Sequence, residues 1–298
     1  MYVCVVICPG IRTIATNVGH LFGRLGIKHS IVYVNSPPLG GYTTSTFSPS
    51  THPADWYLII GTVQVDPLPS KYIAWQIEQI DSPHITPRYV NTLQRATYTW
   101  HFSAHSLQEK PTPSETSFVV PLLYAPGKTR PRDCARTGRI LFYGSPNHRR
   151  NTILQALRGR YGGDKVIAKH GVMGDALDQL IQNVDMVVNL HYYTRASLEM
   201  ARINEVLRNG RKVVTECGMP VDHNMNREMY PEHAVCIVPT IQDDLSNIAV
   251  LYEGIDKTLA DPVMQPPHEI EDMHLSYLQR ALDASRTVSY THLRAHET

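Results

Sequence analysis

Short hydrophobic runs alternate along this chain with longer stretches of helical periodicity. The first run, Tyr2–Cys8, is followed by a glycine-bearing loop, by a helix predicted over Thr16–Leu25 that ends at Gly26, and by a β-branched run, Ser30–Val34. A strand, a crossover helix and a second strand form the βαβ unit from which parallel sheets are built. The pattern therefore predicts that the chain begins as an α/β domain.

The same alternation continues to about residue 124. Residues 35–53 are rich in Pro, Gly, Ser and Thr, and we expect them to form a loop. A helix is predicted over Pro87–Ala96, and further strands are predicted at Trp56–Gly61, Tyr72–Gln76, Tyr98–Phe102 and Phe118–Pro121. Residues 1–124 are thus expected to form an N-terminal Rossmann-like domain.

A charged segment without apolar periodicity, residues 125–138 (APGKTRPRDCARTG), predicts a linker. The alternation restarts after it, with strands expected at Arg139–Tyr143, Val166–Ala168, Asp185–Leu190, Lys212–Thr215 and Ala234–Val238. Helices are expected at Arg150–Tyr161, Ala176–Asn183, Ala196–Asn209 and Ile241–Leu259, the last opened by Asp243 and Asp244. Residues 139–267 therefore form a second doubly wound α/β domain in this interpretation, and a central cleft between the two domains is the expected ligand site.

The end of the chain divides into a helix and a tail. The helix is predicted over about His268–Ser285, and residues 268–287 close the natural part of the sequence. Residues 288–298 (VSYTHLRAHET) have neither helical nor strand periodicity and resemble the conceptual translation of a transposon adapter used in sequencing libraries. We expect this tail to be non-native and the natural C-terminus to be missing. Uninterrupted genomic DNA encoding these residues would refute the expectation.

Composition restricts the class of protein. Hydrophobic residues make up 42% and charged residues 18% of the 298 residues, as in globular proteins. Lys and Arg (28) balance Asp and Glu (27), so no basic field is expected for a nucleic-acid partner. The apolar N-terminus reaches Pro9-Gly10 too early for a secretory signal, and no segment approaches the roughly 20 residues of a membrane span. Five scattered cysteines without a CxxC pair indicate reduced thiols, a cytoplasmic location and no zinc site.

The densest chemical signal lies in Asp185–Glu216. Its hydrophobic run delivers Asn189, His191 and Tyr192 to the carboxyl end of a predicted strand, and a helix is expected to begin near Ser197. The N-terminus of a helix offers free N–H groups and a partial positive charge, which suit a pyrophosphate. No second histidine stands at ligand spacing beside His191, so we expect no metal.

Three charged residues follow at intervals of three in the same segment: Glu199, Arg202 and Glu205. This spacing places them on one face of the predicted helix. A carboxylate about two turns into the helix is suited to accept both hydroxyls of a ribose. The alternative interpretation is a plain amphipathic helix with solvated charges.

A second candidate site follows the strand at the start of the second domain. There the sequence reads Gly144-Ser145-Pro146-Asn147-His148-Arg149-Arg150. A strand that ends in Gly-Ser lets the backbone approach a ligand, and an arginine beyond it is suited to neutralise a diphosphate. The alternative is a helix start with exposed arginines. Without a GxGxxG or GxxxxGK[ST] pattern, dinucleotide and P-loop sites lose support.

These segments resemble the GT-B glycosyltransferases, particularly their group-1 and CgeB-like branches, over roughly residues 55–255. In that family a strand, a short loop, a helix carrying a Glu, a Gly turn and a VV strand follow in the order seen in Asp185–Glu216. The resemblance implies that Glu205 holds the donor ribose and that Arg149 or Arg150 is the basic residue of the first loop. The chain departs from the family at Ser197, where another Glu is common; Glu199 or Glu216 are the candidates to replace it.

The resemblance assigns the acceptor to the N-terminal domain. Gln76 and Glu78, in Ile73–Gln79, follow a predicted strand and are expected to face the cleft. Glu78 is the candidate catalytic base if the reaction inverts the anomeric centre. A surface helix start is the alternative for this segment.

Together these observations predict a hexosyltransferase-like enzyme that uses a nucleoside-diphosphate sugar without a metal or other cofactor. The acceptor, whether glycan, lipid or protein, is not indicated. Two alternatives stay open. One is a nucleotide-sugar epimerase, which would require cofactor-binding glycines. The other is a non-catalytic GT-B-like module that binds a glycan or a nucleotide, which Ser197 favours.

Overall fold

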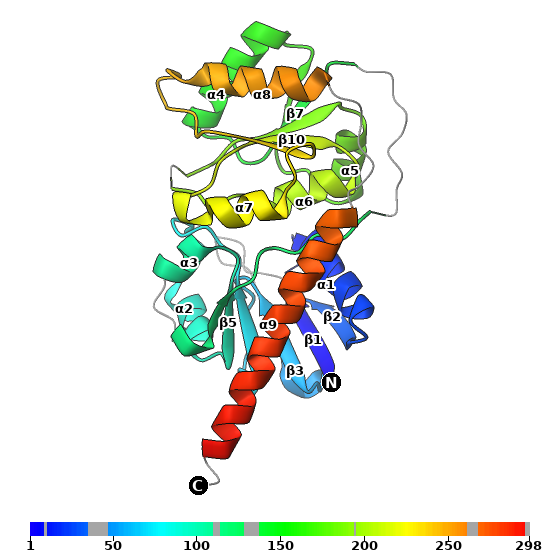
Figure 1. Ribbon diagram of the computed structural model, residues 1–298, viewed down its shortest axis with the longest axis vertical. Coiled ribbons are helices and arrows are strands. Elements are labelled where there is room, and N and C mark those ends of the chain that lie inside the picture. The colour runs from blue at the N-terminus through cyan, green and yellow to red at the C-terminus, as the bar shows by residue number, and fades with distance from the viewer. Residues whose placement is uncertain are drawn as a thin grey trace. The chain divides into compact units, whose positions relative to one another are not determined.

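In a computed structural model, the chain forms two compact α/β units (Figure 1). Unit 1 comprises residues 1–125 and 272–298, and unit 2 comprises residues 126–271. The structure describes residues 1–8, 11–34, 47–109, 114–127, 137–193, 195–260 and 268–295. Each unit contains one parallel sheet, so the predicted pair of parallel-sheet α/β domains is confirmed.

The sheet of unit 1 has six parallel strands in the order β2-β1-β3-β4-β5-β6. They are β1 (Tyr2–Ile7), β2 (Lys28–Tyr33), β3 (Trp56–Ile60), β4 (Tyr72–Gln76), β5 (Tyr98–His101) and β6 (Ser117–Val119). The central strands β1, β3 and β4 are almost continuously buried, as expected where both faces of a parallel sheet are covered. The chain leaves β1 for β2 on one side and later enters β3 on the other, so β1 and β3 form the switch point.

The helices of unit 1 are α1 (Arg12–Arg24), α2 (Pro87–Gln94), α3 (Ala104–Glu109) and α9 (His268–Ala295), the last assigned to this unit from Asp272. Two short 3₁₀ turns complete it, at Pro49–Thr51 and Ser114–Thr116. Helix α2 shows why a helix begins here: the Thr86 hydroxyl accepts the Tyr89 N–H at 3.3 Å, and Pro87 occupies the first helical position. Helix α9 continues beyond the predicted end at Ser285, through residues of the expected tail.

The sheet of unit 2 has five parallel strands in the order β11-β10-β9-β7-β8. They are β7 (Ile140–Tyr143), β8 (Val166–Lys169), β9 (Met186–Asn189), β10 (Lys212–Glu216) and β11 (Val235–Val238). The helices are α4 (His148–Tyr161), α5 (Asp175–Gln182), α6 (Met200–Arg208), α7 (His223–Met229) and α8 (Ile248–Ala260), with a 3₁₀ turn at Pro220–Asp222. Aliphatic side chains of α4 and α8 pack on the sheet in one core with strand residues such as Ile140, Val188 and Val214.

Two predicted helix starts in unit 2 are wrong. Helix α6 begins at Met200 rather than near Ser197, because the preceding segment packs against a loop: a Cβ on Gly218 would lie 2.6 Å from the Leu198 nitrogen. Glu199 is therefore the residue that precedes the helix, not a member of its face. Helix α8 begins at Ile248 rather than Ile241, because side chains bind the preceding backbone in a loop.

Other differences concern two short helices and the start of α4. Helix α3 and helix α7 were not predicted, since each is too short and too polar for its periodicity to stand out. Helix α4 begins at His148, earlier than expected, because the Asn147 side chain accepts the Arg150 N–H at 2.8 Å. Most of the loop predicted over residues 35–53 and of the linker predicted over 125–138 lies outside the described residues.

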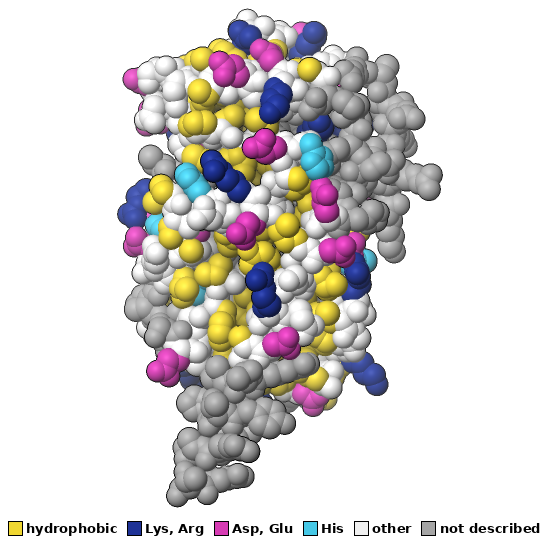
Figure 2. Space-filling model, viewed as in Figure 1, with side chains coloured by type: hydrophobic (Ala, Val, Ile, Leu, Met, Phe, Trp, Pro, Cys, Tyr) yellow, Lys and Arg dark blue, Asp and Glu magenta, His cyan; other side chains and the backbone are white. Residues whose placement is uncertain are grey.

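The surface shown in Figure 2 carries Lys and Arg side chains scattered among acidic and hydrophobic ones. Within the described part of the chain, no helix combines the length and the apolar character that crossing a membrane requires.

Candidate functional site at the sheet edge of unit 2

The candidate residues of unit 2 gather at the carboxyl edge of its sheet. The chain leaves β7 for β8 on one side and later enters β9 on the other, so the strand order reverses between β7 and β9. Ligands of open α/β sheets bind at the carboxyl ends of the strands at such a switch point. Gly144 and Ser145 follow β7, while Asn189 ends β9 and is followed closely by His191 and Tyr192. The structure thus brings the two predicted segments of the donor site together.

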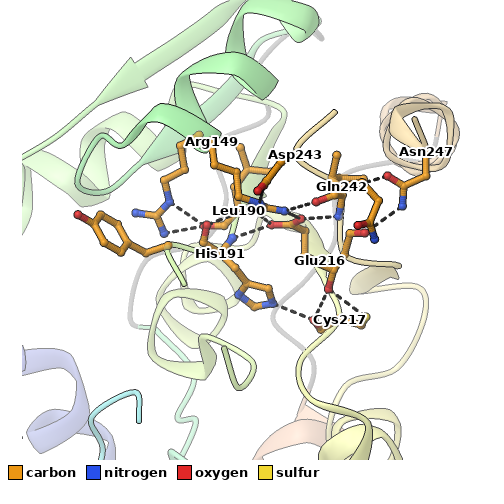
Figure 3. A network of polar contacts seen from close by, with 12 residues as sticks. Arg149, Leu190, His191, Glu216, Cys217, Gln242, Asp243 and Asn247 are labelled. Atoms are coloured by element: carbon orange, nitrogen blue, oxygen red, sulfur yellow. Dashed lines mark hydrogen bonds and ion pairs between the residues drawn. The ribbon is translucent and has the colours of Figure 1, made fainter. Parts of the chain in front are cut away.

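Arg149 and Glu216 form a buried ion pair beside this point (Figure 3). Glu216 is fully buried, and its carboxylate accepts hydrogen bonds from both Nη groups of Arg149. It also accepts the backbone N–H of His191 and that of Ile241, both at 2.7 Å. Arg149 also donates to the carbonyls of His191 and Ile241, and its Nε lies 3.3 Å from Asp243. Every N–H direction of the guanidinium faces an oxygen of the protein. The pair therefore joins the ends of β9, β10 and β11.

Arg150, the neighbour of Arg149, points into the switch point. It is 2% exposed, donates to the Leu190 carbonyl from Nε at 3.0 Å and from Nη2 at 2.6 Å, and reaches the Ser145 carbonyl at 2.9 Å. Its guanidinium also lies 5.1 Å from the centre of the Tyr192 ring and 3.1 Å from Glu199. Arg150 therefore holds the loop after β7 and the loop after β9 in fixed positions.

Arg202 and Glu199 form a second ion pair closer to the surface, each with 16% of its side chain exposed. The Nη1 of Arg202 contacts Glu199 and also the Oδ1 of Asn189. Burial raises the pKa of Glu199, but Arg202, His191 and Arg150 outweigh this and lower it to about 2. Glu199 is therefore ionised at neutral pH. In Arg202, by contrast, only Nη1 makes these contacts, and Nε and Nη2 have no hydrogen-bond partner among the described residues.

Glu205 lies one turn beyond Arg202 on α6 and accepts a hydrogen bond from the Tyr143 hydroxyl at 3.1 Å. Burial, together with the charge of Glu205, raises the pKa of Tyr143 well above its usual value, so the hydroxyl stays a donor. Arg202 packs over the Tyr143 ring, 5.3 Å from its centre. Tyr143 thus fixes the two charged side chains of α6 relative to the end of β7.

His191 and Tyr192 differ in exposure. His191 is 1% exposed, and its Nε2 lies 2.9 Å from the Cys217 carbonyl, which makes Nε2 the donor. Its Nδ1 has no hydrogen-bond partner among the described residues and lies 4.0 Å from Glu199. Tyr192 is 39% exposed, and its carbonyl accepts the Asn147 side-chain amide at 3.0 Å. His191 supports the site from beneath, whereas Tyr192 is at its surface.

Gly144 permits the close approach of these groups. Its φ of 147° lies in the region that favours glycine, and a Cβ would come 3.0 Å from Arg202 Nη2 and 3.3 Å from Arg150 Nη1. Ser145, which follows it, is exposed. The backbone at the end of β7 therefore lies directly against two guanidinium groups.

Replacing Gly144 by alanine is expected to lower the free energy of unfolding by about 1–3 kcal/mol, because the new residue is strained and displaces Arg202. Urea unfolding followed by circular dichroism measures the change. Gly163→Ala is the matched control, since a Cβ at Gly163 meets no atom within 4 Å. Equal stability of the two variants would contradict the strain inferred at Gly144.

In unit 1, Glu78 lies in the turn after β4. The carboxamide of Gln76 accepts the Glu78 N–H at 2.7 Å and donates to its carbonyl at 3.1 Å, while the Glu78 carboxylate accepts the Ser82 hydroxyl at 3.0 Å. Gln76 is completely buried and also accepts the Tyr89 hydroxyl, so it is a structural residue of this turn. The alternative of a helix start is wrong, because α2 begins only at Pro87. The catalytic role of Glu78 stays a prediction.

One residue of the site, Tyr143, was not singled out from the sequence, because it reads as an ordinary strand residue. Arg149 and Arg150 were both candidates, but their adjacent positions gave no indication of which one enters the switch point. The signal that distinguishes them is the cap at Asn147, since it fixes the register of α4 and turns Arg150 inward.

No protein-family model matches the sequence, and no curated protein is similar enough to count as a match. Among solved structures, Anabaena HepE in complex with UDP-glucose is 11% identical over 98% of this chain and 99% of its own, with a TM-score of 0.45. A mutant O-GlcNAc transferase from Thermobaculum terrenum is 12% identical over 97% of this chain and 69% of its own (TM-score 0.47). A putative UDP-N-acetylglucosamine 2-epimerase from Listeria monocytogenes is 9% identical over 100% and 97% (TM-score 0.45). These values assign neither a family nor a function to the chain.

Proposed function

We propose that the chain is a glycosyltransferase that takes its glycosyl group from a nucleoside-diphosphate sugar bound at the carboxyl edge of unit 2. The observation that carries the proposal is the approach of Arg202 to the Gly144 backbone at the switch point, with Glu205 one turn farther along α6. This arrangement offers a cation and close backbone to a diphosphate and a carboxylate to a ribose.

The diphosphate is assigned to Arg202 rather than to Arg149. Arg149 directs all its N–H groups at protein oxygens, and moving it would strip Glu216 of its counter-charge in a buried place. Arg202 has two nitrogens without a hydrogen-bond partner among the described residues. Its ion-pair partner, Glu199, does not depend on Arg202 alone, because Glu199 also contacts Arg150. Arg149 is therefore a positioning residue in this proposal.

In the transfer, an acceptor hydroxyl oxygen forms a bond to the anomeric carbon while the bond from that carbon to the diphosphate oxygen breaks. The nucleoside diphosphate leaves with the electron pair, and the hydroxyl proton passes to a base, for which Glu78 stays the candidate if the reaction inverts the anomeric centre. Arg202 and the dipole of α6, whose positive end lies at Met200, stabilise the negative charge that grows on the leaving oxygen. With these groups the step needs no metal ion.

Titration calorimetry with UDP, GDP, ADP and NAD tests the proposal. One diphosphate is expected to bind, and Arg202→Met or Glu205→Gln is expected to weaken it by roughly 10- to 100-fold, the value of a charge-assisted contact. Arg158→Met and Glu253→Gln are the matched controls, because both side chains are exposed elsewhere in unit 2. Hydrolysis of the corresponding nucleotide sugar then separates an enzyme from a binding module.

A folded protein that binds none of these nucleotides would refute the proposal. Binding without donor hydrolysis or transfer would favour the non-catalytic module. Ser197 also favours that module, because its short side chain, 1% exposed, replaces the carboxylate that is common in the resembling family.

A further inference from the structure

A cavity of about 750 Å³ lies within unit 2 at the carboxyl ends of β10 and β11. Its walls are the loop of residues 217–223 and the loop of residues 239–247, with Arg149 and Ala196 at its margin. Cavities of this size hold small organic ligands. Neither loop contributes to the switch-point contacts of Arg202 and Glu205, so the cavity is a separate feature of the edge.

The loop of residues 239–247 is held rigidly. The Asn247 side chain accepts the Gln242 N–H at 2.8 Å and donates to the Thr240 carbonyl at 2.9 Å, and Asp244 accepts the Ser246 N–H at 2.9 Å. Leu245 has a φ of 60°, a conformation that non-glycine residues rarely adopt. Figure 3 shows this loop attached to Arg149 and Glu216. Such strain persists where the surroundings fix the backbone, and it is frequent at ligand sites.

The lining matches hydroxyl groups better than anions. The rigid loop presents the side chains of Gln242, Asp243, Asp244 and Ser246, all exposed, to the cavity. The guanidinium in the lining, Arg149, is occupied by Glu216 and by backbone carbonyls, so the two aspartates would repel a phosphate. Carboxylates, an amide and a hydroxyl accept from and donate to ligand hydroxyls, while the apolar residues of the lining (Met219, Pro220, Pro239) offer a surface for C–H groups.

We propose that this cavity binds a neutral saccharide. The inference rests on the proposed function, since a transferase must hold a sugar near its nucleotide. The segment that supplies Ala196 to the cavity continues into Glu199, which contacts Arg202. The same chemistry fits two sources, a free or acceptor saccharide and the glycosyl group of the donor.

The methyl group of Met219 is the reporter. Protein labelled with ¹³C at the methionine methyls gives one signal for each of the nine methionines, and Met219→Leu identifies the relevant one. The probes are lactose, maltose, N,N′-diacetylchitobiose, UDP and UDP-glucose. A shift with a free disaccharide identifies a saccharide that binds without a nucleotide. A shift with UDP-glucose but not with UDP or the disaccharides identifies the donor sugar.

The double variant Gln242→Ala, Asp244→Asn is expected to weaken the saccharide by about tenfold, because it removes an amide and a charged acceptor. Asn at position 244 retains the oxygen that accepts the Ser246 N–H, so the loop keeps its fold. Glu253→Gln is the matched control: Glu253 is exposed on α8, and this substitution removes one negative charge, as the double variant does. It should leave saccharide binding unaltered.

Three results would overturn the inference: a Met219 signal unmoved by every sugar-bearing probe, a signal moved by UDP alone, or equal affinity of the double variant and the control. Failure of the proposed function gives a different result, since nucleotide binding is measured through Arg202 and Glu205. If a saccharide shifts the Met219 signal but the protein binds no nucleotide, the cavity is a saccharide site and the proposed transferase function is refuted.

Discussion

Replacing Glu216 by alanine should lower the free energy of unfolding of unit 2 by about 3–5 kcal/mol. The side chain is fully buried, and its removal leaves Arg149 without its buried counter-charge, with only the exposed Asp243 beside it, and leaves the N–H groups of His191 and Ile241 without an acceptor. A buried charge and buried N–H groups that lose their main acceptor cost far more than the lost contact, which explains the size of the effect.

Urea unfolding followed by far-ultraviolet circular dichroism measures this loss. Tryptophan fluorescence supplies a second signal, because all three tryptophans (Trp56, Trp75 and Trp100) belong to unit 1. Asp243→Asn is the control: Asp243 meets the same arginine but is 78% exposed, so we expect a change below about 1 kcal/mol. If Glu216→Ala cost no more than Asp243→Asn, the buried network would not support the sheet edge as inferred.

Acidification should destabilise unit 1 through two buried histidines. Burial lowers the pKa of His101 to about 4 and that of His274 to about 3, and His274 Nδ1 accepts the Tyr124 N–H at 2.9 Å, which requires an unprotonated nitrogen. Between pH 6.5 and about pH 4 the unfolded chain therefore binds more protons than the folded one. Stability then falls as the pH falls, by roughly 1.4 kcal/mol per pH unit for each histidine.

The free energy of unfolding at pH 7 and at pH 5, followed by tryptophan fluorescence, gives the slope for this unit. His274→Gln should reduce the difference between the two pH values by about 2 kcal/mol relative to the original chain. His84→Gln replaces an exposed histidine of the same unit and should leave the slope unchanged. A stability that is flat between pH 7 and pH 5 would show that these histidines protonate as readily in the folded chain as in the unfolded one.

The arrangement of the strands was predictable because burial in a parallel sheet leaves a continuous hydrophobic run in the sequence. The runs at Tyr2–Cys8, Tyr72–Gln76 and Lys212–Thr215 all became strands with nearly the predicted bounds. The alternation with helices then required parallel pairing, and the polar residues after Tyr143 and Asn189 pointed to the carboxyl edge of unit 2.

The ends of helices were less predictable, because side-chain contacts from distant segments decide them. Asp243 and Asp244 resemble the start of a helix, yet Glu216 and Asn247 hold the preceding backbone N–H groups, those of Ile241 and Gln242, in a loop, and α8 begins later. Near α6, the packing of Leu198 against Gly218 delays the start to Met200. Local sequence carries no record of either partner.

The sequence by itself determined which strands form, how the two sheets are wound and which polar residues stand at the edge of unit 2, since these depend on short-range periodicity. Only the tertiary structure decided the roles of the arginines. Arg149 and Arg150 are adjacent and chemically identical, but one turns to buried Glu216 and the other to the Leu190 carbonyl, while Arg202 contacts Glu199 and Asn189. The direction of a charged side chain depends on where its counter-charge lies in space, and that position arises from the packing of elements far apart in the chain.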